Sequence, residues 1–198
     1  MRTISLHQPH ASAIPLLAKG VETRGWPYPP YRGPLAIHAA KRCVRRELQA
    51  YRQIPCWQAA LAGTALMAET EPDYATCLPF GAIVAVCEVV DCRPHGSFTL
   101  EEIRTRRTRP GLAPELFWTE EDMGLWDLGR FGWVLANVRA LAEPLPWKGS
   151  QGFFDVPDEL ILSRLSQEPG EVPVKKPLAS GETEARMPSE QQKELQLA

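Results

Sequence analysis

Residues 16–26 read Leu-Leu-Ala-Lys-Gly-Val-Glu-Thr-Arg-Gly-Trp, and residues 31–41 read Tyr-Arg-Gly-Pro-Leu-Ala-Ile-His-Ala-Ala-Lys. The first stretch leaves an apolar helical pattern and passes directly into a strand pattern. In that strand Glu22 and Arg24 occupy alternate positions, so the carboxylate and the guanidinium share one face. Lys19, at the corner between helix and strand, can reach the same face. The sequence therefore predicts a cluster of three charged side chains beside Trp26.

The remaining pattern predicts about six strands with short helices between them. Strands are expected at residues 2–6, 21–24, 35–39, 82–90, 132–141 and 153–156, and helices at 8–20, 42–52, 57–66, 99–109 and 157–165, with Gly20 ending the first helix. This arrangement is typical of an α+β fold, a small mixed β-barrel with inserted helices, over residues 1–166. Residues 167–198 are rich in Glu, Pro, Ser, Gln and Lys, which predicts a disordered tail.

The bulk composition excludes several classes of protein. The net charge is −2, but residues 1–54 carry a balance of +7 and residues 55–166 a balance of −7. One positive face that meets phosphate is compatible with this asymmetry, and so is ordinary surface charge that intermixes on folding.

No apolar run approaches the ~20 residues of a membrane span, and the first residues lack a signal-peptide pattern, so we expect a cytoplasmic protein. Five cysteines without a Cys-x-x-Cys pair support no disulfide framework, and we expect neither a metal nor a cofactor.

Five sequence blocks carry a resemblance to a known family. They are the opening at residues 4–11, the charged motif formed by the two stretches quoted above, the strand at 80–90, the run at 131–138 and the closing segment at 144–152. In this order they resemble the ASCH domain family, a branch of the PUA-like β-barrels, over roughly residues 1–157. The family motif usually has Gly two residues before the Lys. Leu17 stands there in this chain, and Gly20 is expected to take over that role.

The resemblance implies a binding cleft beside the first helix, lined by the charged motif. By resemblance, the ligand is single-stranded RNA or a modified nucleoside or nucleotide. Lys19 and Arg24 suit phosphate or carbonyl oxygens, and the aromatic rings of Trp26, Tyr28 and Tyr31 suit stacking on bases. Further candidates for ligand contact are Tyr31, Arg32, His38, Lys41 and Lys148. For His38, on an apolar strand, a structural role is the competing interpretation.

Glu88 interrupts the most apolar strand of the sequence. An unpaired buried carboxylate costs several kcal/mol, so we expect Lys19 or Arg24 to pair with it across the barrel. The competing interpretation places Glu88 at the end of the barrel, facing water. A second cluster, the arginines at 104, 106, 107 and 109, either contacts a phosphate backbone or completes a helix dipole in solvent.

Three functional hypotheses use the same residues. The leading one is an RNA- or nucleotide-binding module. The second is a metal-independent hydrolase, because some ASCH proteins that are similar at the cleft are amidohydrolases on N4-acetylcytidine. Those enzymes use a Lys, a Thr three residues later and a Glu on a later strand. Lys19 and Glu88 match, but Glu22 replaces the Thr, so an amidohydrolase or ribonuclease would instead use Glu22 or Glu88 as general base and Lys19 or Arg24 for the oxyanion. The third is a static ion-pair network in a protein-interaction module.

Overall fold

One six-stranded sheet organises the protein in the computed structural model, which describes residues 1–30 and 33–165. The strands are β1 (Arg2–Leu6), β2 (Val21–Arg24), β3 (Pro34–Ala39), β4 (Ala82–Pro94), β5 (Phe131–Pro146) and β6 (Phe153–Asp155). Their order is β2-β5-β4-β3-β1-β6, with β1 parallel to β3 and the other pairs antiparallel. The sheet is curled, and register shifts along β4 and β5 provide the bends that this curvature requires.

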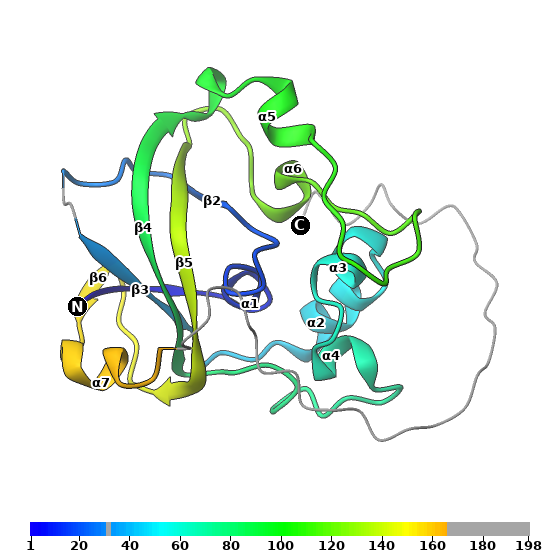
Figure 1. Cartoon of the computed structure of the whole chain (residues 1–198), viewed down its shortest axis with the longest axis horizontal. Coiled ribbons are helices and arrows are strands. Elements are labelled where there is room, and N and C mark those ends of the chain that lie inside the picture. The colour runs from blue at the N-terminus through cyan, green and yellow to red at the C-terminus, as the bar shows by residue number, and fades with distance from the viewer. Residues whose placement is uncertain (31–32, 166–198) are drawn as a thin grey trace.

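Short helices surround the sheet. They are α1 (His10–Ala13), α2 (Arg45–Arg52), α3 (Pro55–Ala60), α4 (Ala65–Ala68), η1 (His95–Ser97), α5 (Leu100–Arg104), α6 (Glu120–Met123) and α7 (Asp158–Leu162). In Figure 1, α2, α3 and α4 gather beside α1, α5 and α6 lie near one end of β4 and β5, and α7 lies near β6. In the part of the chain described, no helix has the length and apolar character to cross a membrane.

Three apolar clusters hold these layers together. The first lies on one face of the sheet and includes Ile37, Trp133 and Ile14. The second joins the far side of the α1 segment to α2, α3 and α4. The third packs α7 against the other face of the sheet. The segment that follows α1 contributes to both of the first two clusters, so the charged motif after it starts from a position fixed on two sides.

The predicted mixed α+β class is confirmed, and the strands fall where the sequence placed them. The differences are in length, because β4 continues to Pro94 and β5 to Pro146. The helix expected at 57–66 is divided into α3 and α4 by a turn around Gly63, which has a φ of 87°. The predicted tail, residues 167–198, lies outside the described residues, as do Tyr31 and Arg32.

Helix α1 ends differently from the expectation that Gly20 stops it. The amide of Ala18 donates to the carbonyl of Ala13 and the amide of Leu17 to that of Ile14, which is the Schellman arrangement. Leu17 occupies the left-handed position of that motif with a φ of 58°, where the resembled family has Gly. Gly20 has another role: a Cβ there would lie 2.9 Å from a carboxylate oxygen of Glu120.

Replacing Leu17 by Gly should stabilise the protein. The left-handed backbone conformation destabilises the folded state by about 1–2 kcal/mol when the residue is Leu, and Gly removes this cost. Gly also gives the unfolded chain more conformational entropy, which cancels about half of the gain in stability. The Leu17 side chain is 53% exposed, so little packing is lost. We expect a net gain of about 0.5–1 kcal/mol, visible as a rise of about 1–3 °C in the melting temperature. Leu17→Ala is the control, because it shortens the side chain and keeps the unfavourable φ. An equal rise for Ala would contradict the backbone explanation.

Candidate functional site

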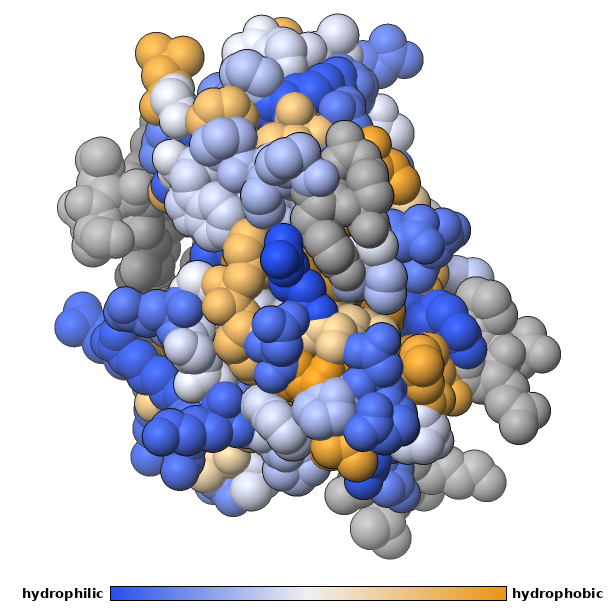
Figure 2. Space-filling model, turned by 90° about the vertical axis from the view of Figure 1, so that its left-hand side faces the viewer, coloured by the Kyte–Doolittle hydropathy of each residue, from blue (hydrophilic) through white to orange (hydrophobic). Residues whose placement is uncertain are grey.

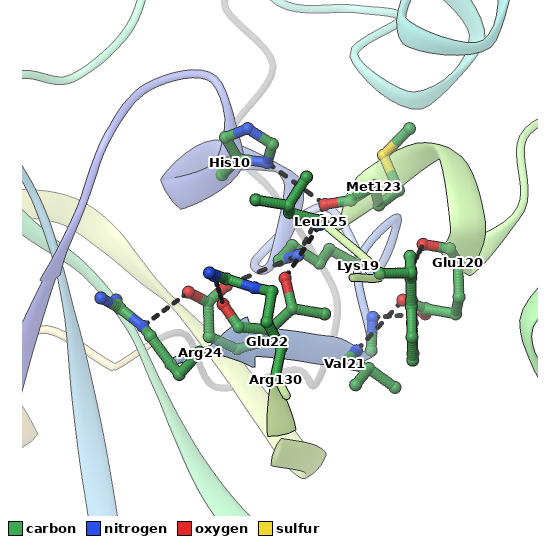
Figure 3. Close-up of polar contacts among 12 residues, drawn as sticks. His10, Lys19, Val21, Glu22, Arg24, Glu120, Met123, Leu125 and Arg130 are labelled. Carbon is green, nitrogen blue, oxygen red and sulfur yellow. Dashed lines mark hydrogen bonds and ion pairs between the residues drawn. The ribbon is translucent and has the colours of Figure 1, made fainter. Parts of the chain in front are cut away.

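The structure brings Lys19, Glu22 and Arg24 together, as their spacing predicted. Lys19 Nζ lies 3.4 Å from Glu22 Oε2, and Arg24 Nε lies 2.9 Å from Glu22 Oε1 (Figure 3). Lys19 Nζ also donates to the carbonyl of Met123 at 2.6 Å, and Arg24 Nη2 donates to the carbonyl of Ser5 at 3.2 Å. Lys19 is 2% exposed and Glu22 7%, whereas 23% of the Arg24 side chain is exposed. Arg24 is therefore the member of this charged cluster that meets solvent.

A carboxylate that the sequence analysis did not select holds the backbone of the same corner. Glu120, on α6, is 2% exposed and accepts hydrogen bonds from the amides of Gly20 at 2.6 Å and Val21 at 3.1 Å. The guanidinium of Arg107 pairs with the same carboxylate. The Glu120 carboxylate thus accepts from two backbone amides, and Arg107 is its counter-ion.

The segment around α6 crosses the whole motif strand. Trp118 Nε1 donates to the carbonyl of Ala18 at 2.8 Å, the amide of Leu125 to Thr23 Oγ1 at 2.9 Å, and Arg130 Nη2 to the carbonyl of Thr23 at 3.0 Å. With those of Glu120 and of the Met123 carbonyl, these contacts extend from Ala18 to Thr23, and Figure 3 draws the ones made by Glu120, Met123, Leu125 and Arg130. The backbone from residue 18 to residue 23 is therefore held by the segment around α6 in addition to the ladder between β2 and β5.

The arginines between residues 104 and 109 fall into two groups. Arg107 and Arg109 support this architecture, whereas Arg104, in the last turn of α5, and Arg106 are exposed, as the interpretation of a helix dipole completed in solvent expected. Arg104 forms a two-pronged ion pair with Glu121, and Arg109 Nη2 donates to the carbonyls of Leu16 at 2.6 Å and Ala60 at 2.8 Å. With Arg107 bound to Glu120, three of the four guanidinium groups have partners within the protein. Arg106 lies over the ring of Phe117, 4.2 Å from its centroid.

His10, on α1, lies on the opposite side of the Met123 carbonyl from the charged cluster. Its Nδ1 is 3.2 Å from that carbonyl oxygen and its Nε2 is 3.3 Å from the hydroxyl of Tyr51. Because a carbonyl only accepts, Nδ1 carries the hydrogen and Nε2 accepts from the tyrosine. Burial, followed by the charge of Lys19, lowers the pKa of His10 to about 3. His10 is therefore neutral at physiological pH.

An aromatic group borders Arg24. The ring of Trp26 packs edge-on against Trp133 with 4.7 Å between centroids, and Tyr28 does so at 4.8 Å. The guanidinium of Arg24 lies 5.8 Å from the Trp133 centroid. Trp133 and Tyr28 are buried, but Trp26 is 37% exposed. Of the predicted stacking residues that the structure describes, Trp26 is thus available to a ligand and Tyr28 belongs to the core.

Glu88 does not join the charged cluster, and the expectation that Lys19 or Arg24 pairs with it is wrong. The Glu88 side chain is exposed, and its Oε2 accepts a hydrogen bond from Asn137 Nδ2 at 2.9 Å. The physical reason is that β4 is covered on both faces only as far as Cys87; from there exposed and buried residues alternate along it. Glu88 lies on the exposed face, so solvent removes the need for a buried cation.

His38 is a structural residue, contrary to its inclusion among the candidates for ligand contact. It is 1% exposed, with Nδ1 at 2.9 Å from the Ser5 hydroxyl and Nε2 at 3.1 Å from the carbonyl of Trp147. Both ring nitrogens are therefore occupied, and burial lowers the pKa of His38. A Cβ on Gly149 would lie 2.3 Å from the ring, so the chain is closed tightly over it.

The two predicted flanking lysines are exposed and lie together at one end of the sheet. Lys41 follows β3 and Lys148 follows β5, where Ala39, Ala82 and Pro146 are register neighbours. Arg24 pairs with Phe131 at the other end of the β4–β5 ladder. Within residues 1–30 and 33–165, neither lysine forms an ion pair with the charged cluster.

Sequence reasoning missed Glu120 and His10 for different reasons. The Thr119-Glu120-Glu121-Asp122 pattern could have predicted a helix start, and Thr119 and Asp122 do form a capping box. It could not say which of two adjacent glutamates turns inward, because the partners lie about one hundred residues away. The role of His10 depends on contacts with Met123 and Tyr51, and no local pattern predicts them.

The arrangement of the side chains suits anion binding by the Arg24 guanidinium better than general-base catalysis by Glu22. Both oxygens of Glu22 face a cation, and Lys19 points at a carbonyl away from solvent. Arg24 has an exposed portion beside an exposed indole ring. Comparison with protein-family models and with curated proteins finds no match to this chain.

Removing the Glu120 carboxylate should destabilise the corner. In Glu120→Ala the amides of Gly20 and Val21 lose their acceptor and Arg107 loses its counter-ion. We expect the free energy of unfolding to fall by about 3 kcal/mol in urea denaturation. Glu121→Ala is the matched control, since that neighbouring carboxylate is 41% exposed and binds Arg104 at the surface. Equal losses for the two variants would contradict the clamp.

Stability should decrease as the pH falls below about 6.5. The unfolded chain takes up a proton on His10 near its ordinary pKa of 6.5, whereas folded His10 does so only at about 3. Between these values the unfolded state binds more protons, and His10 alone contributes up to about 1.4 kcal/mol per pH unit. His38 acts in the same direction. Urea midpoints at pH 7, 6, 5 and 4 measure the slope. His10→Asn should flatten it and the exposed His7→Asn should not; an unchanged slope in His10→Asn would contradict the assignment.

Proposed function

We propose that this chain is an ASCH-type, PUA-like module that binds single-stranded RNA or a modified nucleotide through Arg24 and Trp26. The observation that carries the proposal is the partly exposed Arg24 guanidinium, held by Glu22 and Ser5 next to an exposed indole ring. Lys19 and Glu22 position this guanidinium and do not themselves contact the ligand. Five sequence blocks that resemble the ASCH family support the same function.

The charge balance of the cluster favours an anionic ligand. Two cations surround one carboxylate, so the three side chains together leave one positive charge, and that charge belongs to the residue nearest solvent. A guanidinium has five N–H donors in a fixed plane. Nε faces Glu22 and Nη2 donates to Ser5, and within the described part of the chain Nη1 has no protein acceptor. A phosphate oxygen fits that open edge.

The geometry around Trp133 supports a base next to the phosphate. Trp26 and Arg24 both lie against the buried Trp133 indole, so they are neighbours on one surface. Packing on Trp133 and on Phe153, 5.4 Å away, orients the Trp26 ring before any ligand arrives. The face that carries β3 and β6 shows hydrophilic and hydrophobic residues side by side (Figure 2), and stacking beside a cation requires such a mixture.

The hydrolase alternative has weaker support. It needs a lysine and two carboxylates in one cleft, and Glu88 is bonded to Asn137 on the exposed face of β4. Glu22 would act as a general base only after leaving one of its two cations. The third hypothesis, a static network, accounts for Lys19 and Glu120 but leaves the exposed Trp26 unexplained.

Fluorescence anisotropy with a labelled single-stranded RNA of mixed sequence tests the binding function. The affinity should fall as salt rises. Trp26→Ala should weaken binding roughly 5- to 100-fold, because stacking contributes about 1–3 kcal/mol per base. Arg24→Gln should weaken it and reduce the salt dependence. Leu128→Ala, which truncates another exposed apolar residue, is the control for Trp26, and Arg46→Ala is the control for Arg24.

The same samples separate the three hypotheses. Mass spectrometry of RNA and N4-acetylcytidine after incubation with the protein should show no change if the chain only binds. Loss of the acetyl group or RNA cleavage, abolished in Glu22→Gln, would favour the hydrolase. RNA affinity that is absent, or unchanged in Trp26→Ala and Arg24→Gln, would contradict the proposed binding surface.

A further inference from the structure

A second candidate site lies on the α2 side of α1. A cavity of about 270 Å³ opens between the end of β1, α1 and the start of α2. Among its lining residues, the partly buried His10 and Tyr51 form what we call the floor, and the exposed His7, Arg42 and Glu47 form the rim. None of the residues of the Arg24–Trp26 surface lines it. The inference below therefore does not depend on the proposed RNA binding.

The rim presents two opposite charges without protein partners. Arg42 and Glu47 are both exposed, and in the part of the chain described neither side chain forms a hydrogen bond or an ion pair. The guanidinium only donates and the carboxylate only accepts. A ligand that satisfies both needs a pair of acceptors on one edge and a pair of donors on another, and no net charge.

The walls favour a flat ligand of limited size. Val44, Leu48 and Phe80 line the cavity with apolar side chains, of which Phe80 supplies an aromatic ring. The volume lies just below the range of about 300–1,000 Å³ that is typical of small-molecule pockets. A single planar ring system with a small substituent suits this space, and a dinucleotide does not.

The floor is organised before any ligand binds. His10 is fixed as the Nδ1–H tautomer by the carbonyl of Met123, and Tyr51 donates its hydroxyl hydrogen to His10 Nε2. The oxygen of Tyr51 consequently keeps lone pairs for the cavity. Edge-on packing of His10, Tyr51 and Trp57, with ring centroids 4.8–5.9 Å apart, holds the two polar rings in place. The floor therefore adds an acceptor, which favours a ligand rich in N–H donors.

We propose that this cavity binds a guanine base. The O6 and N7 acceptors of guanine match a guanidinium with two parallel hydrogen bonds, which places that edge on Arg42. The N1–H and N2–H donors form the opposite edge and match the carboxylate of Glu47. Adenine, cytosine and uracil each lack one of these two paired edges. Phe80 and Leu48 cover the faces of the ring.

Isothermal titration of the full chain with guanosine tests the proposal. Guanosine should bind at one site, at least about tenfold more tightly than adenosine, cytidine or uridine, because a bidentate pair discriminates by this order. Glu47→Gln keeps the size of the side chain and should weaken guanosine binding at least about tenfold, and Arg42→Ala should do the same. Both side chains are exposed and unpaired within the described residues, so folding should be retained.

Matched variants make the result decisive. Arg46→Ala and Glu71→Gln alter exposed residues of the same kinds outside the cavity and should leave guanosine binding unchanged. Trp26→Ala should weaken RNA binding and leave guanosine binding intact, so the two proposals can fail separately. Absence of guanosine binding, equal binding of the four nucleosides, or insensitivity to Arg42→Ala and Glu47→Gln would each overturn the inference.

Discussion

The corner between α1 and β2 depends on one buried carboxylate. Where the chain leaves α1, the amides of Gly20 and Val21 point at Glu120 and have no strand or helix partner there. Unpaired buried amides would cost about 1–3 kcal/mol each. An unpaired carboxylate would satisfy the amides, but burying its charge would itself cost free energy. Arg107, which is partly exposed, pairs with Glu120 and lowers that second cost. Every position in the charged motif follows from this corner, because Lys19, Glu22 and Arg24 branch from the backbone that Glu120 holds.

The ion pairs of the motif orient its side chains more than they stabilise the fold. Buried pairs gain little net free energy, because desolvation offsets most of the attraction. The pairs nevertheless orient Glu22, because Lys19 lies at one of its oxygens and Arg24 at the other. Lys19 is in turn fixed by the carbonyl of Met123. The contacts therefore form a series from the core outward, in which Lys19 positions Glu22 and Glu22 positions Arg24. Arg24 reaches solvent with its guanidinium already oriented. A pre-oriented cation loses less conformational entropy on binding an anion.

Local patterns predicted the strands and the shared face of Glu22 and Arg24, since each depends on residues that are close together in the sequence. They failed where distant segments decide. Glu88 was expected to be buried because an apolar run surrounds it, but a run does not reveal where a sheet stops being covered on both faces. Glu120 and Glu121 are adjacent and alike in sequence, yet one supports the corner and the other pairs at the surface. Only the tertiary fold distinguishes them.

The carbonyl of Met123 joins the two candidate sites. It accepts from Lys19 Nζ and from His10 Nδ1, which uses both of its lone pairs. His10 must then accept at Nε2, so any group that displaces the Tyr51 hydroxyl from this nitrogen must itself be a donor. A ligand with only acceptors would require a proton on His10, and burial, followed by the adjacent charge of Lys19, opposes that proton. The lysine that faces Glu22 on one side of the Met123 carbonyl thus adds to burial in keeping His10 Nε2 an acceptor on the other side.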